Sequence, residues 1–213
     1  MKDKGTTKRN VIMGQYFFLF LCFLFLAGCD GGPFSPNFPS DVELTYLLCD
    51  TIDVLWMQPF GNVDHGGGNA FFHDGIDMGT VNGGRFFSCA EGEIDDVEIN
   101  TGKGLPGTNY RIMIKVAKNI ILDYHFEIGG SVSEAERENN IFVSKGDWVQ
   151  AGQHIANLIV LSGAAHVHWG IYDSDTAGIC PLDYFTATLA QEFEALYDSG
   201  IEKRPASRPD LCE

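Results

Sequence analysis

Short apolar or alternating segments, separated by glycine-containing turns, dominate the middle of the chain. Residues 85–90 and 93–99 flank a Glu-Gly pair, a pattern that predicts a hairpin. Residues 110–116 and 119–128 are rich in β-branched and aromatic side chains and predict two more strands. Shorter strand patterns occupy residues 145–149, 152–156 and 166–172. Together these segments predict a mainly β protein, arranged as an antiparallel β-sandwich.

One helical pattern stands out near the C-terminal end. Apolar residues recur at helical spacing from Leu182 to Leu196. Pro181 suits the first turn of a helix, and Gly200 suits its end. The pattern therefore predicts a single C-terminal helix that packs its apolar stripe on the sheet.

The N-terminal residues have the pattern of an export signal. Basic residues precede an apolar run that ends in Leu-Ala-Gly before Cys29. Small residues behind a short apolar core predict a secretory signal peptide, here residues 1–28. A cysteine in this position resembles a bacterial lipobox, which implies that Cys29 is lipidated and holds the protein on a membrane. A plain signal peptide or an uncleaved anchor is the alternative, because the run reaches the length of a membrane span.

The rest of the chain has the length of one domain. Residues 29–45 include a Pro- and Gly-rich stretch and predict a tether, whereas 46–200 predict the folded core. Residues 201–213 predict an irregular tail, and the polar stretch 131–140 predicts a loop between strands. The formal net charge of −15 makes nucleic acid a poor partner. The sequence leaves the oligomeric state open.

Four cysteines lie outside the predicted signal and lipidation site: Cys49, Cys89, Cys180 and Cys212. An even number in an exported protein predicts up to two disulfides. Four cysteines allow three pairings, and the sequence does not choose among them. We favour Cys180 with Cys212, because that bond would hold the C-terminal tail. A cysteine-based zinc site is the rival hypothesis, but the chain has no Cys-x-x-Cys.

Two histidines alternate in the last strand pattern. In a strand, residues two apart point to the same face, so His166 and His168 would both face one point. Imidazole is the usual nitrogen ligand of zinc in proteins. Taken alone, this pattern is equally that of two ordinary strand histidines.

A second pattern combines a histidine with a carboxylate. His73 and Asp77 lie four residues apart, and Gly75 between them would let the backbone bend toward one ion. Asp77 would add a negative charge to offset the cation. His125 ends a strand pattern and supplies a further polar group. The two patterns together offer three or four metal-ligand candidates from distant parts of the chain.

The order of these motifs resembles the lysostaphin/LytM-type zinc metallopeptidases, which are mostly peptidoglycan endopeptidases. The resemblance covers roughly residues 55 to 185 and implies the duplicated-hybrid-motif fold of that family. Each motif is weak alone, but the ordered set is specific. The similar segments are 72–79, 89–94, 123–126, 143–153 and 166–171.

The resemblance also implies roles for individual residues. His73, Asp77 and His168 would bind Zn2+, and His125 and His166 would be the two catalytic imidazoles. The implied activity is that of a zinc metalloendopeptidase that hydrolyses peptide bonds in peptidoglycan cross-bridges or stems. Combined with lipidation at Cys29, it implies an exported bacterial lipoprotein of the cell envelope.

The chain departs from the family where the family builds its groove walls. The segment 161–165 is shorter and more apolar than the usual Ser-Thr-Gly stretch, and Gly170 replaces an acidic residue. The segments 102–109 and 130–141 are also unusual. These departures concern the substrate more than the metal.

Three other functions remain open from sequence. A catalytically silent module that binds cell wall or regulates a hydrolase is the main alternative, although this chain keeps all five family positions. A zinc endopeptidase of glycine-rich proteins and a structural lipoprotein with incidental histidines are the others. His65 and His154 are expected to be a loop residue and a strand-surface residue.

Overall fold

The computed structural model describes residues 38–64, 70–99, 107–173, 176–199, 201–204 and 210–212, without the side chains of 176–178. The predicted signal peptide 1–28, the lipidation site Cys29 and the loop residue His65 lie outside this part of the chain. Within it, no helix is long and apolar enough to cross a membrane.

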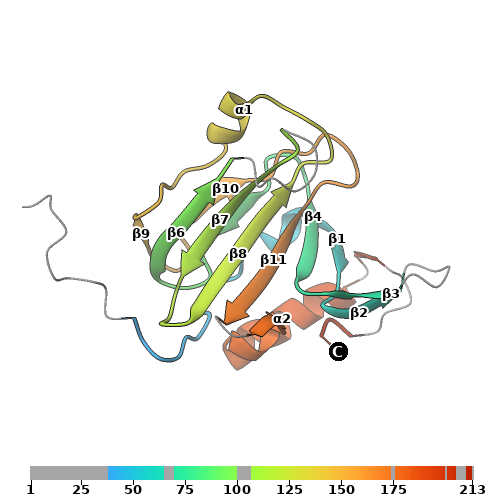
Figure 1. The fold of residues 1–213 in the computed structure, drawn as a ribbon. Helices are drawn as coiled ribbons and strands as arrows, with labels where there is room; N and C mark the ends of the chain where they lie inside the picture. The colour runs from blue at the N-terminus through green and yellow to red at the C-terminus, as the bar shows by residue number, and fades with distance from the viewer. Residues whose placement is uncertain are drawn as a thin grey trace, which may run out of the picture. The chain divides into compact units, whose positions relative to one another are not determined.

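Nine of the described strands form one large sheet (Figure 1). Its order is β13-β1-β4-β11-β8-β7-β6-β9, and β12 pairs with β11 beside this path. The pairings are antiparallel except for that of β1 with β13, which is parallel. The strands are β1 (Val54–Gln58), β4 (Ile76–Thr80), β6 (Gly92–Glu98), β7 (Asn109–Lys115), β8 (Ile120–Glu127), β9 (Trp148–Val149), β11 (His166–Asp173), β12 (Thr176–Ile179) and β13 (Glu202–Lys203).

Two small sheets and short helices complete the described fold. β2 (Gly61–Asp64) pairs with β3 (Ala70–His73), and β5 (Arg85–Phe87) pairs with β10 (His154–Asn157). The helices are η1 (Thr51–Asp53), α1 (Glu134–Glu138), η2 (Pro181–Tyr184) and α2 (Ala187–Asp198). The mainly β class predicted from the sequence is confirmed.

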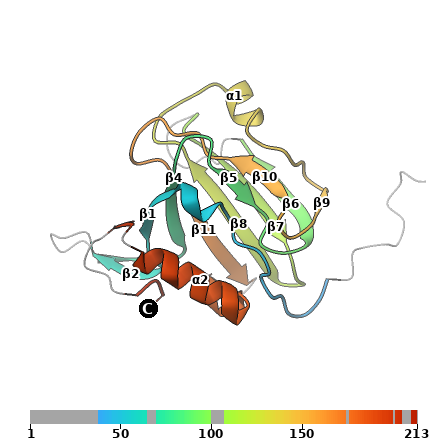
Figure 2. The same cartoon turned by 180° about the vertical axis from the view of Figure 1, so that it is seen from behind.

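One face of the large sheet is covered, and the other carries polar side chains. Figure 2 shows the β5–β10 pair and α2 in front of the same side of the sheet. Phe126 of β8 packs on Phe86 of β5, with ring centroids 5.3 Å apart, and Trp169 of β11 packs on Phe193 of α2 at 6.3 Å. Since strand residues alternate between faces, His125, one place before Phe126, points to the opposite side. The second layer of the predicted sandwich is therefore a small strand pair together with a helix.

The predicted hairpin over residues 85–99 is wrong. β5 pairs with β10 in the second layer, whereas β6 pairs with β7 and β9 in the large sheet. Cys89 and Ala90 between them are buried, because the chain crosses the core from one layer to the other. Two adjacent strand patterns predict a hairpin only when both strands belong to the same sheet.

The predicted C-terminal helix is split. Pro181 begins the short η2, and α2 begins only after Thr186, whose side chain accepts a hydrogen bond from the Leu189 amide at 3.3 Å. Threonine is a favoured N-cap residue, so a new helix begins at this position. The apolar spacing had predicted one continuous helix across it. The predicted end at Gly200 lies outside the described residues, and α2 ends at Asp198.

The polar stretch 131–140 is also more regular than predicted. It contains the one-turn helix α1, whose first turn is capped by Ser133, since the hydroxyl accepts a hydrogen bond from the Glu136 amide at 3.2 Å. A local serine cap makes a short helix compatible with a stretch that has no apolar periodicity.

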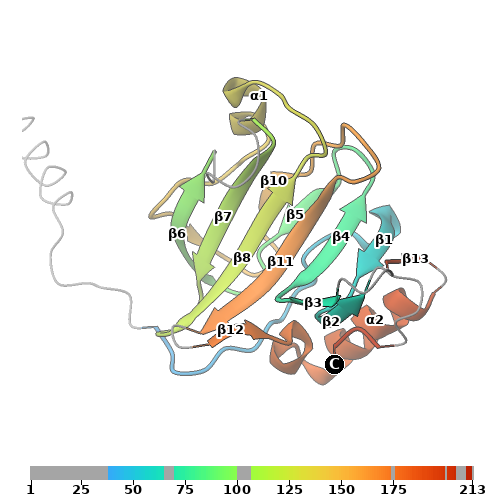
Figure 3. The same cartoon turned by 45° about the vertical axis from the view of Figure 1, so that its right-hand side comes forward.

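The segments on both sides of the predicted core, 46–200, are also packed against it. Leu44, inside the predicted tether, is fully buried and its amide donates to the Tyr184 carbonyl at 2.7 Å. In the predicted irregular tail, β13 pairs with β1, as Figure 3 shows, and Leu211 is buried. The packed unit therefore includes segments on both sides of 46–200.

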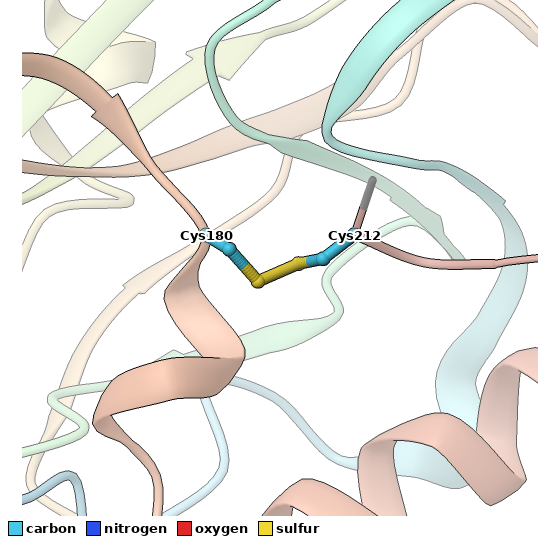
Figure 4. Close-up of a disulfide and its surroundings, with 2 residues drawn as sticks. All are labelled: Cys180 and Cys212. Atoms are coloured by element: carbon cyan, nitrogen blue, oxygen red, sulfur yellow. A yellow bond between two sulfur atoms is a disulfide. The ribbon is translucent and has the colours of Figure 1, made fainter.

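One disulfide joins the tail to the rest of the fold. Cys180 and Cys212 are bonded, with Cα atoms 5.8 Å apart, which confirms the favoured pairing (Figure 4). Cys49 and Cys89 are buried and free. Cys180 immediately precedes η2, so the bond ties the last described residues to the segment between β12 and α2.

Candidate metal centre

The register of three neighbouring strands places three of the candidate residues in one row. In β11, His168 is the direct partner of Asp77 in β4 on one side and of His125 in β8 on the other. Directly paired residues on one face lie within contact distance of each other. His73 joins this row from the end of β3.

The side chains of His73, Asp77 and His168 converge. His73 Nε2 lies 3.1 Å from Asp77 Oδ1 and 3.1 Å from His168 Nδ1, and His168 Nδ1 lies 2.8 Å from Asp77 Oδ1. One ligand atom from each residue lies within 4.8 Å of the other two. His73 and Asp77 are buried, and His168 is partly buried. These residues could hold a metal ion.

His73 and His168 each have a second ring nitrogen, on the side of the ring away from Asp77, and this nitrogen has its own partner. His73 Nδ1 donates to the Pro59 carbonyl at 2.7 Å, and His168 Nε2 lies 3.4 Å from Asp74 Oδ1. Such outer contacts orient metal-ligating histidines and determine which nitrogen is left for the metal. Asp74 was not among the site residues predicted from the sequence, although its place between His73 and Gly75 made it a candidate for such a contact.

The charges within the cluster stabilise one another. Burial alone would raise the pKa of Asp77, but its side-chain contacts with His168 and His73 hold that pKa below its ordinary value. Burial would lower the pKa of His168, but its hydrogen bonds to Asp74 and Asp77 raise it to about 10. A hydrogen bond with His168 lowers the pKa of Asp74. The cluster therefore holds Asp77 as a carboxylate, ready to bind a cation.

Gly75 is needed for a different reason from the one predicted. A Cβ at this position would lie 2.7 Å from both Cε1 and Nε2 of His168 and 2.7 Å from the Trp169 carbonyl oxygen. The missing side chain therefore makes room for the His168 ring. The sequence had suggested that Gly75 lets the backbone bend. In the structure, Gly75 leaves space for the ring.

His166 lies beside the cluster. Its Nε2 is 3.6 Å from Asp77 Oδ2, and its Nδ1 donates to the Ala164 carbonyl at 2.8 Å. Because a carbonyl oxygen only accepts, the proton of a neutral His166 is on Nδ1 and the lone pair is on Nε2. That lone pair faces the carboxylate of the cluster.

His125 lies on the other side of His168. Its Nδ1 is 3.9 Å from Glu127 Oε1, and burial lowers its pKa. Its Nε2 is buried and has no hydrogen-bond partner among the described residues. A buried nitrogen of this kind is ordinarily satisfied by a water or a ligand. His125 is therefore a neutral imidazole with one position left for such a group.

A pocket of about 430 Å³ opens on His125 and His168. Arg111 and Asp123 form part of its wall and are joined by two hydrogen bonds, of 2.7 Å and 2.8 Å. Neither residue was among the site residues predicted from the sequence. Asp123 lies two places before His125 in β8, and Arg111 is the direct partner of His125 in β7, so strand alternation was the signal that could have found them.

The structure separates His154 from the five site residues. His154 lies in β10 of the small sheet, where its Nε2 contacts the Ala156 carbonyl at 3.1 Å and Asn157 Oδ1 at 2.8 Å. It thus belongs to a strand of the second layer and, in the described part of the chain, has no contact with the candidate metal ligands, as expected for a residue outside the site. His65 lies outside the described residues.

The converging atoms suit a zinc ion. In a tetrahedral site with bonds near 2.0 Å, two ligand atoms are roughly 3.3 Å apart, and the three separations here are 2.8–3.1 Å. Two imidazoles and one carboxylate form a donor set that zinc accepts. The Pro59 carbonyl and Asp74 supply the outer contacts of the two histidines. A small outward movement of the ligands would complete the fit.

No protein-family model matches the chain, and no curated protein does. Several solved structures are similar to it. One is Helicobacter pylori Csd3, with 18% identity, a TM-score of 0.44, and coverage of 76% of this chain and 40% of that one. A zinc-containing peptidase from Vibrio cholerae has 17% identity, a TM-score of 0.39, and coverage of 62% and 39%.

A third solved structure is the catalytic domain of a mutant of EnpA, a prophage-encoded M23 protein from Enterococcus faecalis. It has 24% identity, a TM-score of 0.39, and coverage of 58% of this chain and 89% of that domain. This chain spans about 40% of the length of the first two proteins. The similar structures thus include a zinc-containing peptidase and the catalytic domain of an M23 protein.

Proposed function

We propose that this chain is a zinc metalloendopeptidase that hydrolyses peptide bonds in peptidoglycan cross-bridges or stems. The observation that carries the proposal is the convergence of His73, Asp77 and His168, whose ligand atoms lie within 4.8 Å of one another. Three protein ligands leave a fourth position open, which distinguishes a catalytic zinc site from a structural one.

A zinc ion held by these residues would supply a Lewis acid that polarises a carbonyl and lowers the pKa of water. His166 presents the lone pair of Nε2 beside Asp77, so it can accept a proton from the attacking water. His125 has a buried nitrogen next to His168 that can donate a hydrogen bond to the developing oxyanion. The proton taken up by His166 can then pass to the leaving amine. Asp74 keeps the ring of His168 oriented.

The choice of peptidoglycan as substrate rests on the ordered motifs that resemble the lysostaphin/LytM-type enzymes. We further propose that the protein acts in the cell envelope of a bacterium as a lipoprotein attached through Cys29. An exported enzyme on a membrane would have its substrate within reach. The silent module remains the second candidate, because a protein of this kind can keep its fold and bind cell wall without cutting it.

Two measurements on purified protein test the proposal. We expect about one zinc ion per chain by elemental analysis, lost in His73→Ala and Asp77→Ala but kept in His154→Ala, whose histidine lies in the small sheet. We also expect wild-type protein to cut defined muropeptides, with products identified by mass analysis.

The outcomes separate the candidate functions. Wild-type protein that carries no zinc and takes up none would refute the enzyme hypothesis. Zinc binding together with wall binding but no cleavage would favour the silent module. Cleavage by His166→Ala at the wild-type rate would refute the role assigned to His166.

A further inference from the structure

Arg204, in the C-terminal tail, contacts Trp56 and Gly163, which both lie close to His166. Its guanidinium carbon lies 4.0 Å from the centroid of the Trp56 ring, and its Nη1 donates to the Gly163 carbonyl at 3.0 Å. The Trp56 ring lies 5.5 Å from the His166 ring. Gly163 immediately precedes Ala164, whose carbonyl accepts the hydrogen bond from His166 Nδ1. One side chain thus contacts the ring beside His166 and the residue that precedes its hydrogen-bond partner.

The guanidinium of Arg204 is itself held in place. Its Nε and Nη2 donate to the two carboxylate oxygens of Glu202 at 2.7 Å and 3.2 Å. The Arg204 amide donates to the Met57 carbonyl at 2.8 Å, which continues the pairing of β13 with β1. A planar guanidinium can stack on an aromatic ring while its N–H groups form hydrogen bonds at its edge. Lysine cannot make this combination of contacts.

Trp56 is also packed against the neighbouring strand β4. It is buried in β1, and a Cβ at Gly79 of β4 would collide with its indole ring. The ring therefore fills the space that Gly79 leaves open, between Arg204 and His166. A ring that is restrained on several sides restricts the orientation of the histidine it touches.

We propose that Arg204 is a positioning residue that keeps His166 in the orientation the reaction needs. With Nδ1 bonded to the Ala164 carbonyl, Nε2 is left 3.6 Å from Asp77 Oδ2, at the metal centre. Loss of Arg204 frees the Trp56 ring and the segment at Gly163, so the imidazole can rotate or exchange its tautomer. The kinetic consequence rests on the proposed function, whereas the orientation of His166 does not.

The first test uses metal-free protein with ¹⁵N-labelled histidine. Imidazole ¹⁵N chemical shifts report which ring nitrogen carries the proton. We expect wild-type His166 to show one tautomer, protonated at Nδ1, and Arg204→Ala to show a mixture. His73 keeps its bond to the Pro59 carbonyl in both proteins, so its tautomer should not change. A general loss of stability would instead affect both histidines.

Arg85→Ala is the matched control. Arg85 also lies over an aromatic ring, 5.4 Å from the centroid of Phe87, and also pairs with a carboxylate, that of Asp50 at 2.7 Å. It belongs to β5 in the small sheet. We expect this variant to leave the His166 signals unchanged. If Arg204→Ala does not fold, Arg204→Gln removes the stacked charge while keeping a donor for the Gly163 carbonyl.

The second test measures hydrolysis. We expect kcat of Arg204→Ala to fall roughly tenfold, since small displacements of a catalytic group have effects of this size or larger. KM and zinc content should stay at their wild-type values, and Arg204→Lys should restore only part of the loss. A single His166 tautomer and a wild-type kcat in the Arg204 variants would overturn the inference. If wild-type protein hydrolyses nothing, the proposed function fails, and the tautomer measurement still decides the role of Arg204.

Discussion

The ring of His168 occupies the space next to the backbone of Gly75. A methyl group there would approach two atoms of the imidazole and one carbonyl oxygen to 2.7 Å, so the ring would have to move. The same ring supplies a ligand atom on one side and contacts Asp74 on the other. The metal centre is therefore sensitive to a residue that has no functional group.

Gly75→Ala should lower zinc affinity by roughly tenfold to a hundredfold, the range seen when outer contacts of a metal site are disturbed. Competition with a chromogenic chelator measures the change. Gly163→Ala is the control, because a Cβ at Gly163 would meet no atom within 4 Å. Equal affinities for Gly75→Ala and wild-type protein would show that the His168 ring can shift without cost.

The protonation of His168 predicts a pH dependence of stability in metal-free protein. Its pKa in the folded state is about 10, above the ordinary value of about 6.5. The folded state thus keeps a proton that the unfolded chain releases. The stabilisation is fully present below pH ~6.5, and the free energy of unfolding should fall as the pH rises from there to about 10.

Urea unfolding in the presence of a chelator, at several pH values across this window, measures the effect. His168→Gln should show a flatter dependence, because glutamine does not titrate. Saturating zinc should also remove the decline, since the ion takes the place of the Nδ1 proton. The same decline in wild-type protein and in His168→Gln would assign it to another group.

At the scale of elements, closeness in sequence did not by itself decide which strands pair, since β7 pairs with β8 but β5 does not pair with β6. β7 and β8 form a hairpin with a short turn, and both strand patterns were apparent from their β-branched and aromatic residues. The pairing of β5 with β10 joins residues about 70 positions apart and could not be predicted from local patterns, because strand pairing over such distances depends on the whole core. The alternation of β11 did predict that His166 and His168 share a face.

The C-terminal tail is an element whose structure depends on contacts with the rest of the fold. The Phe60 amide donates to the Leu211 carbonyl at 3.0 Å, next to Pro59, whose carbonyl orients His73. The bond between Cys180 and Cys212 closes a loop with a sequence separation of 32 residues. A loop of this length is associated with roughly 2–4 kcal/mol of stabilisation, since the bond restricts the unfolded chain.

Replacing both bonded cysteines, Cys180→Ala with Cys212→Ala, should therefore lower the free energy of unfolding by roughly 2–4 kcal/mol. Denaturant unfolding measures it. The double variant is also the control for the effect of a reductant. It keeps only free thiols such as Cys49 and Cys89 among the described residues, so a reductant should destabilise wild-type protein but leave the double variant unchanged. An equal effect of reductant on both proteins would place its target elsewhere.

At the scale of the whole molecule, the folded unit carries its candidate metal centre on the face opposite α2 and the β5–β10 pair. Figure 2 shows the covered side, and the polar row of β4, β11 and β8 belongs to the other. The pocket of about 430 Å³ that His125 and His168 line lies on this side as well. Attachment by the N-terminal segment would keep such a surface near the cell wall.

Cys29→Ser, expressed with its leader, tests that attachment. If Cys29 is lipidated, the variant should move from the membrane fraction to the aqueous fraction, because it lacks the residue through which the acyl chains anchor the protein. Fractionation and immunoblotting measure it, with Cys49→Ser as a control for loss of a cysteine. A variant that stays in the membrane fraction would favour an uncleaved anchor.

The strands that carry His73 and Asp77, β3 and β4, were not predicted, but the sequence by itself determined the mainly β class, the strand patterns of β7, β8 and β11, and the five candidate site residues. These follow from local patterns: period-two alternation, turn residues, and the spacing of histidines and an aspartate. It also pointed to an even set of cysteines outside the predicted signal.

Only the tertiary structure decided which atoms meet. His73 and His168 are 95 residues apart, and their nitrogens reach 3.1 Å because β3, β4 and β11 assemble around one point. The outer contacts with Asp74 and Pro59, the space at Gly75 and the support of His166 by Arg204 arise in the same way. Alternation assigns a side chain to a face, but the neighbours it meets there depend on long-range pairing and packing, which no local pattern encodes.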